Sequence, residues 1–301
     1  MGIVSSKPQN VLSSSTTSKR EGAYALVTGA TSGIGRDLAN ELCNRGLNVI
    51  IHGRDPERLQ AVGEELRERY PSCEVRDMLL DASTAFTASG EANDETQKSL
   101  EWVKDLNIKV LVNNAGIGHN PAKDFISFDE QTPTQITKLI HVNISFITLL
   151  THALLPALKR NASSQSPSFI INAGSLAELG LPWVSVYSGT KAYITGFSKA
   201  LDTELKGEGC HVEVISSLLG DTDSDGHKVG TSLFTPSSED MAGMILTSAA
   251  ASGAVVRIPY WGHLIQLWLC KIQPYRLLQK GMIYNITELR EKNGLVAKKQ
   301  S

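Results

Sequence analysis

The feature that most constrains the fold of this chain is a glycine-rich turn between an apolar run and an amphipathic run near the N-terminus. Residues 24–28, Tyr-Ala-Leu-Val-Thr, have the character of a buried strand, and Gly29-x-x-x-Gly33-x-Gly35 follows at once. Apolar residues then recur at helical spacing, at Leu38, Ala39, Leu42 and Cys43. Glycines between a strand and a helix let the backbone approach a phosphate, which the helix N-terminus then faces. The turn therefore predicts a dinucleotide site, with an ordinary glycine turn as the weaker alternative.

Short apolar strands and helices alternate along the rest of the chain. We expect further strands over residues 48–52, 74–80, 109–113, 169–172 and 211–216, with a last one from Val255. Helices are expected after Asp55-Pro56 and over residues 95–105, 134–159, 186–206 and 238–250. This alternation predicts an α/β fold in which helices cover both faces of a parallel sheet.

The two ends differ from this central part. Residues 1–20 are rich in Ser and Thr with little apolar content, so we expect them to be disordered. Residues 21–258 are expected to form one domain and residues 259–301 an amphipathic C-terminal extension. The extension is too short and too interrupted by polar residues for a membrane span. Three alternatives remain open for its apolar run: contact with a membrane surface, a cover over an apolar substrate, or packing on a partner subunit in a homo-oligomer.

Tyr187 and Lys191 form a Tyr-x-x-x-Lys spacing, with Ser175 twelve residues before the tyrosine. Residues i and i+4 share one helix face, so the phenol and the ammonium can point into one cavity. The cation is expected to lower the pKa of the phenol toward neutral pH, while the serine hydroxyl orients a carbonyl. Such a set moves a proton at an oxygen but has no source of electrons, so a cofactor must supply hydride.

Two more motifs follow the glycine turn in order, Asn113-Asn114-Ala115-Gly116 and then Asn143. With Ser175, Tyr187 and Lys191 after them, the chain resembles the short-chain dehydrogenase/reductase family over roughly residues 24–258. The resemblance implies a Rossmann-type, doubly wound sheet and a nicotinamide cofactor. It also implies a catalytic set of Asn143, Ser175, Tyr187 and Lys191.

The roles of these residues follow from the same resemblance. Tyr187 would donate the proton, and Ser175 would hold the carbonyl oxygen. Lys191 would serve both the phenol and the nicotinamide ribose, and Asn143 would position a relay water. The cofactor-binding positions expected in this way are Thr28, Gly29, Ser32, Gly33, Ile34, Gly35, Arg54, Asp81, Asn113, Ala115, Gly116, Asn143, Tyr187, Lys191, Gly220 and Thr222.

The end of the second expected strand distinguishes the two nicotinamide cofactors. In this class of fold an acid there accepts the ribose hydroxyls and would repel a ribose phosphate. Here the strand ends at Gly53, and Arg54 follows, which can meet the phosphate as a charged fork. We therefore expect NADP, as NADPH, rather than NAD. An exposed Arg54 paired with Asp55 or Glu57 is the alternative interpretation.

Three other positions leave their roles open. Asp81 matches the family's acid beside the adenine, or it caps a loop. Asn113 ends an apolar strand, and we expect both a bracing role toward the backbone and a place in the wall of the cofactor site. After the strand at 211–216 the family has Pro-Gly and then a Thr over the nicotinamide amide. This chain has Leu219-Gly220 and Thr222, so the path of the loop and the role of Thr222 are open.

The composition fits an enzyme with a substantial core and narrows its partners. Hydrophobic residues make up 41% of the 301 residues, and a formal net charge of −2 without a basic stripe argues against nucleic acid. The four cysteines have no metal-binding spacing, so we expect no metal and an intracellular, cytoplasmic protein with reduced thiols. The end Lys298-Lys299-Gln300-Ser301 has the di-lysine arrangement of endoplasmic-reticulum membrane proteins, and Met1-Gly2 begins an acylation pattern, so contact with that membrane is a second interpretation.

The sequence thus predicts an NADPH-dependent reductase, reversible in principle, that acts on a bulky, mostly apolar ketone or alcohol. The run from Pro259 to His263 resembles the very-long-chain 3-oxoacyl-CoA and steroid reductase branch, and fungal enzymes of secondary metabolism. One alternative is 3-oxoacyl-CoA reduction in fatty-acid elongation. The alternative from another class is a nucleotide-binding scaffold without turnover.

Overall fold

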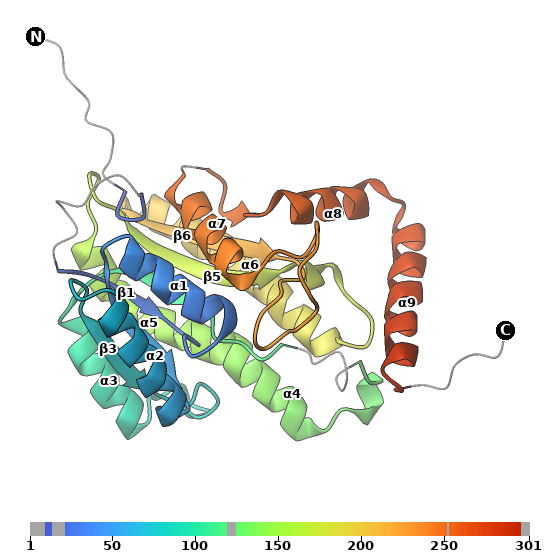
Figure 1. Ribbon diagram of the computed structural model, residues 1–301, viewed down its shortest axis with the longest axis horizontal. Helices are drawn as coiled ribbons and strands as arrows, with labels where there is room; N and C mark the ends of the chain where they lie inside the picture. The colour runs from blue at the N-terminus through green and yellow to red at the C-terminus, as the bar shows by residue number, and fades with distance from the viewer. Residues whose placement is uncertain (1–9, 14–21, 119–124, 252, 296–301) are drawn as a thin grey trace, which may run out of the picture.

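The computed structural model describes residues 10–13, 22–118, 125–251 and 253–295, which form a parallel sheet of seven strands between two layers of helices (Figure 1). The strand order is β3-β2-β1-β4-β5-β6-β7. The strands are β1 Ala23–Val27, β2 Asn48–Gly53, β3 Val75–Leu79, β4 Asn107–Asn113, β5 Ser168–Ser175, β6 Val212–Leu219 and β7 Val256–Arg257. Each neighbouring pair is parallel, as predicted.

The helices before the C-terminal extension lie close to the expected positions. They are α1 Gly33–Asn44, α2 Pro56–Arg69, α3 Asp94–Lys104, α4 Pro133–Ile140, α5 Ile147–Asn161, α6 Ser185–Gly207, α7 Ser238–Ala250, α8 Trp261–Ile272 and α9 Tyr275–Lys292. Asp55 caps α2, since its side chain accepts a hydrogen bond from the Arg58 backbone N–H, and Pro56 takes the first helical position.

Alternate side chains of the central strand β1 enter two separate cores. Ala25 packs in a cluster with Leu38 of α1 and residues of α7. Leu26 packs in the other cluster, with Leu150 of α5 and Leu201 of α6. Because successive strand residues face opposite sides of a sheet, both faces are covered by helices. The predicted doubly wound fold is confirmed.

The chain crosses from one side of the sheet to the other after β3, so β4 pairs with β1 on the side away from β2. In open α/β sheets, ligands bind in the crevice at the carboxyl ends of the strands on either side of such a reversal. The Gly29 turn follows β1 and the Asn114 turn follows β4. Both turns therefore lie at this crevice.

The helix expected over residues 134–159 is a continuous helical run with a π-helical turn, His141–Phe146, between α4 and α5. The run Pro133–Asn161 is long and apolar enough to cross a membrane by composition. Its residues Leu150, Leu154 and Leu158 are instead buried in the core under the sheet. We therefore treat it as a core helix.

Residues 10–13 differ from the disorder expected for residues 1–20. Leu12 is fully buried, and its carbonyl accepts a hydrogen bond from Arg45 Nη1 at 2.6 Å. The Asn10 side chain donates to the Ala250 carbonyl at the end of α7. Two adjacent apolar residues, Val11 and Leu12, are enough to dock this short segment, although the surrounding composition is polar. The acylation pattern and the di-lysine end lie outside the described residues.

Helices α8 and α9, residues Trp261 to Lys292, are called the C-terminal arm below. In Figure 1, α8 runs along one edge of the molecule and α9 turns away from it at the side, so that its far end lies beside the segment before α4. The arm lies at the edge of the same end of the sheet that carries the crevice.

Candidate active site

The Gly29 turn is packed so closely that two of its positions require glycine. Gly29 has a φ of +66°, a left-handed conformation that other residues disfavour. A Cβ on Gly35 would lie 2.1 Å from the Gly29 carbonyl oxygen and 2.4 Å from Nδ2 of Asn114. The Asn114 amide also donates to the carbonyls of Thr28 and Gly29. The turn is therefore held by the segment after β4, and at Gly29 and Gly35 its backbone carries no side chain.

Helix α1 begins directly behind this turn. Ser32 is its N-cap residue, with extended backbone and no hydrogen bond from its side chain to the helix. Gly33 has a φ of +52°, and a Cβ there would lie 3.2 Å from the Cβ of Ser224 in the loop after β6. The first N–H groups of α1, including that of Ile34, are suited to a pyrophosphate because the helix dipole adds to their positive charge.

Thr28 and Asn113, which the sequence assigned to the cofactor, brace the fold with their side chains. Both are fully buried. The Thr28 hydroxyl accepts from the backbone N–H groups of Asn114 and Ala115. Asn113 Nδ2 donates to Asn172 Oδ1 at 2.8 Å. For Asn113 this is the bracing role expected from the sequence, because strand ends in a buried sheet need their polar groups satisfied internally. The contact of Thr28 and Asn113 with a cofactor stays a prediction.

Strand β2 ends at Gly53, and the space for a side chain there is occupied. A Cβ on Gly53 would lie 2.4 Å from Cγ2 of Thr31 in the Gly29 turn. Arg54 is exposed, and Asp55 forms its ion pair with Arg58 rather than with Arg54. An acid at residue 53 would have to displace Thr31, so this end of the crevice keeps the positive charge of Arg54.

Asp81 caps the loop after β3, which is the second of the two roles expected from the sequence. Its Oδ1 accepts from the N–H and from the hydroxyl of Ser83, each at 2.8 Å. Burial opposes ionisation, but these hydrogen bonds and the charges of Arg54 and Lys138 outweigh it and lower the pKa of the carboxyl. The carboxylate is ionised at neutral pH, and its Oδ2 takes part in neither bond.

His52 supports the site and was not identified from the sequence. Its side chain is 3% exposed, and Nδ1 accepts a hydrogen bond from the Gly29 N–H at 3.1 Å. Its ring stacks on Phe146, with the centroids 5.3 Å apart. Burial lowers the pKa of His52 to about 4, so the ring is neutral and can accept this bond. The only sequence signal was a polar residue inside an apolar strand.

Three residues of the expected catalytic set come from β5 and α6. Ser175 ends β5, and Tyr187 and Lys191 lie one turn apart on α6. The Ser175 and Tyr187 side chains are hydrogen bonded to each other. Lys191 is buried, its Nζ donates to the Ala173 carbonyl at 2.8 Å, and Nζ lies 5.6 Å from the centroid of the Tyr187 ring.

The expected fall in the phenol pKa was wrong for this arrangement. Burial raises the pKa of Tyr187, the hydrogen bond with Ser175 opposes the rise, and the charge of Asp221 adds to it. Burial also lowers the pKa of Lys191 to about 8. Lys191 donates to the Ala173 carbonyl rather than to the phenol, and burial is the main cause of the raised phenol pKa. The phenol therefore keeps its proton at neutral pH.

Asn143 lies in the π-helical turn between α4 and α5. Ile117 donates its N–H to Asn143 Oδ1 at 2.8 Å, and Asn143 Nδ2 donates to the Ile117 carbonyl at 3.0 Å. A Cβ on Gly116 would lie 3.5 Å from Asn143 Oδ1 and 3.8 Å from Lys191 Nζ. Gly116 therefore lies next to both polar groups, and a π turn at such a position is common in functional sites.

The segment after β6 is held by α8. Leu219 keeps the backbone N–H that proline would lack, and β6 stays in register with β5 as far as Ser175. Gly220 donates its N–H to His263 Nδ1 at 3.0 Å, a contact the sequence did not predict. Thr222 is buried, and its hydroxyl donates to the Gly220 carbonyl at 3.3 Å. Its role over the nicotinamide stays a prediction.

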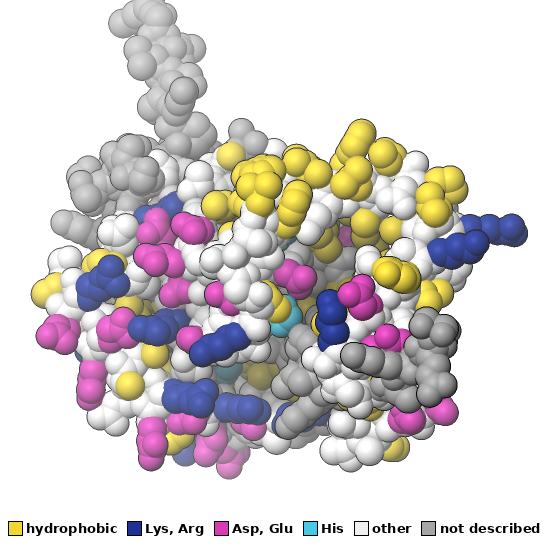
Figure 2. All heavy atoms as spheres, turned by 45° about the vertical axis from the view of Figure 1, so that its right-hand side comes forward, with side chains coloured by type: hydrophobic (Ala, Val, Ile, Leu, Met, Phe, Trp, Pro, Cys, Tyr) yellow, Lys and Arg dark blue, Asp and Glu magenta, His cyan; other side chains and the backbone are white. Residues whose placement is uncertain are grey.

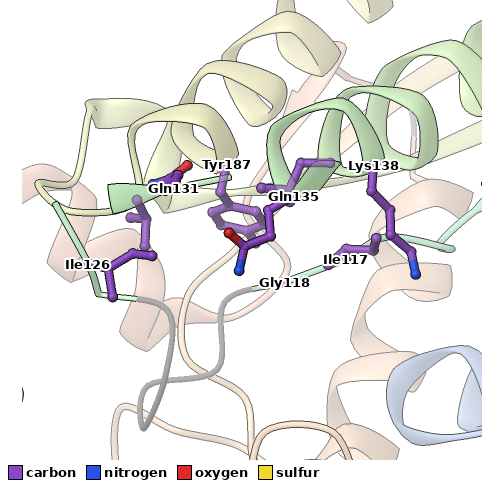
Figure 3. A pocket seen from close by; sticks show the side chains of 9 residues that line it. Ile117, Gly118, Ile126, Gln131, Gln135, Lys138 and Tyr187 are labelled. Carbon is purple, nitrogen blue, oxygen red and sulfur yellow. The ribbon is translucent and has the colours of Figure 1, made fainter. Parts of the chain in front are cut away.

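A cavity of about 140 Å³ opens beside Tyr187 (Figure 3). Its other lining residues are Ile117, Gly118, Ile126, Gln131, Gln135, Lys138, Leu139 and Val184. Figure 3 shows Gln135 extending from α4 beside the Tyr187 ring, with Ile126 on one side and Ile117 on the other. The phenol therefore faces a largely apolar space with a few polar groups, as expected for a site that takes an apolar carbonyl compound.

Comparisons with known proteins agree with this geometry. The family model described as short chain dehydrogenase matches residues 23–231. The very-long-chain 3-oxoacyl-CoA reductase-like protein of Arabidopsis thaliana is 32% identical over 268 residues, which cover 86% of this chain and 80% of that protein.

Two solved structures share the fold at 25% sequence identity. A metagenomic short-chain oxidoreductase in complex with NADP has a TM-score of 0.61, and the match covers 79% of this chain and 96% of that one. The bulky-bulky ketone specific alcohol dehydrogenase from Comamonas testosteroni also has a TM-score of 0.61, covering 83% of this chain and 94% of that one.

Proposed function

The chain belongs to the short-chain dehydrogenase family, and on that premise we propose that it uses NADPH to reduce a bulky, mostly apolar ketone to a secondary alcohol. It is an oxidoreductase that acts between a keto group and CH–OH. The observation that carries the substrate class is the apolar cavity beside Tyr187, with Ile117, Ile126 and Val184 in its walls. The similar dehydrogenase from Comamonas testosteroni, named for bulky ketones, supports this choice.

In this proposal Tyr187 donates its proton to the carbonyl oxygen as negative charge develops there. Ser175, which is hydrogen bonded to the phenol, holds the same oxygen. Lys191 has a pKa of about 8, so it is mostly protonated at neutral pH, and its positive charge favours the phenolate that remains after proton transfer. Asn143 is fixed by Ile117 and orients a water toward Lys191. NADPH supplies the hydride, because no side chain can do so.

The residues of the crevice fit this cofactor. The backbone at Gly29 and Gly35 carries no side chain, and the N-terminus of α1 behind it can receive the pyrophosphate. Gly53 with the exposed Arg54 supports NADPH over NADH, and Asp81 can accept from the adenine amino group. The remaining positions proposed to contact the cofactor are Thr28, Ser32, Gly33, Ile34, Asn113, Ala115, Gly116, Gly220 and Thr222.

A 3-oxoacyl-CoA is the second candidate substrate. The observation that favours it is the name of the Arabidopsis thaliana relative, a very-long-chain 3-oxoacyl-CoA reductase-like protein. A 3-oxoacyl chain is also an apolar ketone, and Lys138 with Gln135 could meet the polar thioester part. A scaffold without turnover is disfavoured, because Ser175, Tyr187 and Lys191 are all present and adjacent.

The test is a substrate panel followed by NADPH absorbance. Bulky cyclic ketones, 3-oxoacyl-CoA compounds of increasing chain length and small ketones are compared on the purified protein. We expect turnover with bulky ketones and little with acetone. Turnover restricted to long 3-oxoacyl-CoA would select the second candidate. No NADPH oxidation with any of them would contradict a reductase.

We also propose that the C-terminal arm contacts a membrane with anionic headgroups. Figure 2 shows hydrophobic side chains gathered along the edge formed by α8. The exposed apolar residues of α8 are Trp261, Leu264, Ile265, Trp268, Leu269 and Ile272. The loop after β6 adds Phe234, whose ring centroid lies 6.3 Å from that of Trp261.

The charge of this part of the chain supports a lipid partner. Residues 259–301 hold seven Lys and Arg against two Glu, although the whole chain has a formal net charge of −2. Lys271, Arg276 and Lys280 are exposed along the arm. An apolar helix face with aromatic residues and basic neighbours is typical of a helix that lies on a membrane. A second copy of the chain is the alternative occupant of this face.

A further inference from the structure

Arg290 is the only buried residue of α9, and it contacts two separate segments of the substrate cavity. Its Nε donates to the Phe125 carbonyl at 2.8 Å. Its guanidinium carbon lies 4.5 Å from the centroid of the Trp183 ring. Phe125 and Trp183 each directly precede a cavity residue, Ile126 and Val184. One side chain of the C-terminal arm thus connects both walls of the cavity.

Trp183 has an unusual backbone that needs such support. Its φ is +61°, and among the described residues it is the one non-glycine residue with positive φ. A bulky residue in this region is strained and persists only where its surroundings hold it. A guanidinium over an indole face is attractive, and more so when it is removed from water. Arg290 is 9% exposed and provides this contact.

The placement of α9 agrees with a local rather than a general role. Its remaining residues are partly or fully exposed, including Ile283 and Tyr284, so the helix adds little to the two cores. Figure 1 shows the far end of α9 beside the short segment that precedes α4. The family model ends at residue 231, so Arg290 lies outside the part of the chain that it matches.

We propose that Arg290 is a positioning residue for the substrate: it holds the Phe125–Ile126 and Trp183–Val184 segments at a fixed separation and so sets which ketones the cavity accepts. The proposal rests on the proposed function, since it takes the cavity beside Tyr187 as the substrate site. The residues proposed to bind NADPH do not include Arg290, Phe125 or Trp183. Loss of Arg290 therefore acts on bulky ketones that fill the cavity, and not on the cofactor.

The test compares Arg290→Ala with Arg276→Ala, a matched change at an exposed position of the same helix. For Arg290→Ala we expect the KM of a bulky ketone to rise about tenfold with kcat within about twofold, because a desolvated cation–π contact and a buried hydrogen bond are lost. NADPH affinity and the kinetics of a small ketone should not change. Arg290→Lys keeps the cation without the planar fork, so its KM should be intermediate. Arg276→Ala should match the wild type.

Trp183→Gly provides a second, independent variant. Glycine adopts the left-handed backbone without strain, so only the ring is removed. It should raise the KM of the bulky ketone as well. Adding it to Arg290→Ala should raise this KM little further, because the contact between the two side chains is already lost. If the two changes raise the KM of the bulky ketone independently, so that their effects add in full in the double variant, the proposal is overturned.

Other outcomes also decide the matter. An unchanged KM for the bulky ketone in Arg290→Ala would overturn the proposal. An equal loss of kcat/KM for every ketone, accompanied by weaker NADPH binding, would also overturn it. If the wild type reduces no ketone, the proposed function fails, and hydrogen exchange tests the positioning alone. The amides of Ile126 and Val184 should then exchange faster in Arg290→Ala than in Arg276→Ala. Equal exchange rates would overturn the positioning role.

Discussion

His263 occupies the space in which a side chain at residue 220 would lie, since a Cβ on Gly220 would be 2.6 Å from Cδ2 of the ring. The same ring accepts the Gly220 N–H at Nδ1 and faces the Asp221 carbonyl with Nε2, at 3.0 and 3.1 Å. Both contacts are satisfied only when Nε2 carries the proton and Nδ1 does not. The C-terminal arm thus holds the turn after β6 with His263, while Arg290 holds the cavity walls.

This arrangement predicts a loss of stability at acid pH. Burial lowers the pKa of His263 below its usual 6.5, so the unfolded chain binds a proton below that pH that the folded chain does not. The free energy of unfolding should therefore fall as the pH drops from about 7 to 5. Urea unfolding at several pH values should show a smaller fall for His263→Gln, which cannot titrate. His52, with a pKa of about 4, contributes in the same direction and stays in both proteins.

His227 is the control with the opposite sign. Its hydrogen bond with Asp221 raises its pKa, so it stabilises the fold at low pH and loses that contribution as the pH rises. His227→Gln should make the acid loss of stability steeper. If the free energy of unfolding of His263→Gln falls with pH as steeply as that of the wild type, the role of His263 is contradicted.

Arg54→Ala should weaken NADPH binding much more than NADH binding. The change removes one charged hydrogen bond to the ribose phosphate, worth about 1.5–3 kcal/mol, or more than tenfold in affinity. Fluorescence titration with both cofactors measures the ratio of their dissociation constants. Arg58→Ala is the matched control, because Arg58 is also exposed but pairs with Asp55. Equal losses for both cofactors, or a wild type that prefers NADH, would contradict the assignment.

The α8 face gives the third prediction. The wild type should float with liposomes that contain anionic lipid, and replacement of Leu264, Trp268 and Ile272 by Ser should release it, because each is more than half exposed. Leu267 is left unchanged, since it is buried and its loss would damage the core. NADPH binding should survive the triple change.

Two exposed apolar residues elsewhere provide the control for flotation. Leu79→Ser with Phe128→Ser should leave lipid binding intact, since neither residue lies on the arm. The wild type could instead stay in solution with lipid, while sedimentation shows a changed oligomeric state for the triple variant. This result would mean that the α8 face binds a second copy of the chain.

The fold could be predicted from the sequence because its signals are local. Strand and helix periodicities, the Asp55 cap and the glycine turn each act over a few residues, and their alternation permits few topologies. The position of Ser175, Tyr187 and Lys191 followed from the order of motifs. In contrast, His263 and Arg290 act on segments far away in sequence, and no local pattern marks such contacts.

Electrostatics and burial were the less predictable part of the site. The spacing of Tyr187 and Lys191 indicates that they are neighbours, but it does not say which hydrogen bond the ammonium makes or how much water reaches the phenol. For the same reason the sequence did not show that Thr28 braces the fold, although it named bracing as one role of Asn113. Their burial depends on how β1, β4 and β5 meet, which periodicity alone does not give.

Lys191 predicts a second pH dependence, at alkaline pH. Its pKa is about 8 in the folded protein against an ordinary 10.5, so between these values the unfolded chain binds the extra proton. The free energy of unfolding of the wild type should therefore rise, relative to Lys191→Met, as the pH increases from about 8 to 10. Activity should fall over the same range, because the ammonium that serves the phenol is lost. If the free energy of unfolding changes with pH in the same way in the two proteins, the lowered pKa of the buried Lys191 is contradicted.

Tyr187→Phe tests the proposed proton donor directly. The change removes one oxygen and leaves the ring, so the cavity and NADPH affinity should persist. Without the phenol no acid meets the developing alkoxide, and general acid catalysis typically contributes about 10²–10⁴-fold. Single-turnover oxidation of NADPH with one accepted ketone should slow by this factor. Tyr193→Phe is the control, since Tyr193 lies on the same helix but its hydroxyl bonds to Thr148 at 3.0 Å on the exposed side. Equal rates in Tyr187→Phe and wild type, with NADPH bound equally, would remove Tyr187 from the chemistry.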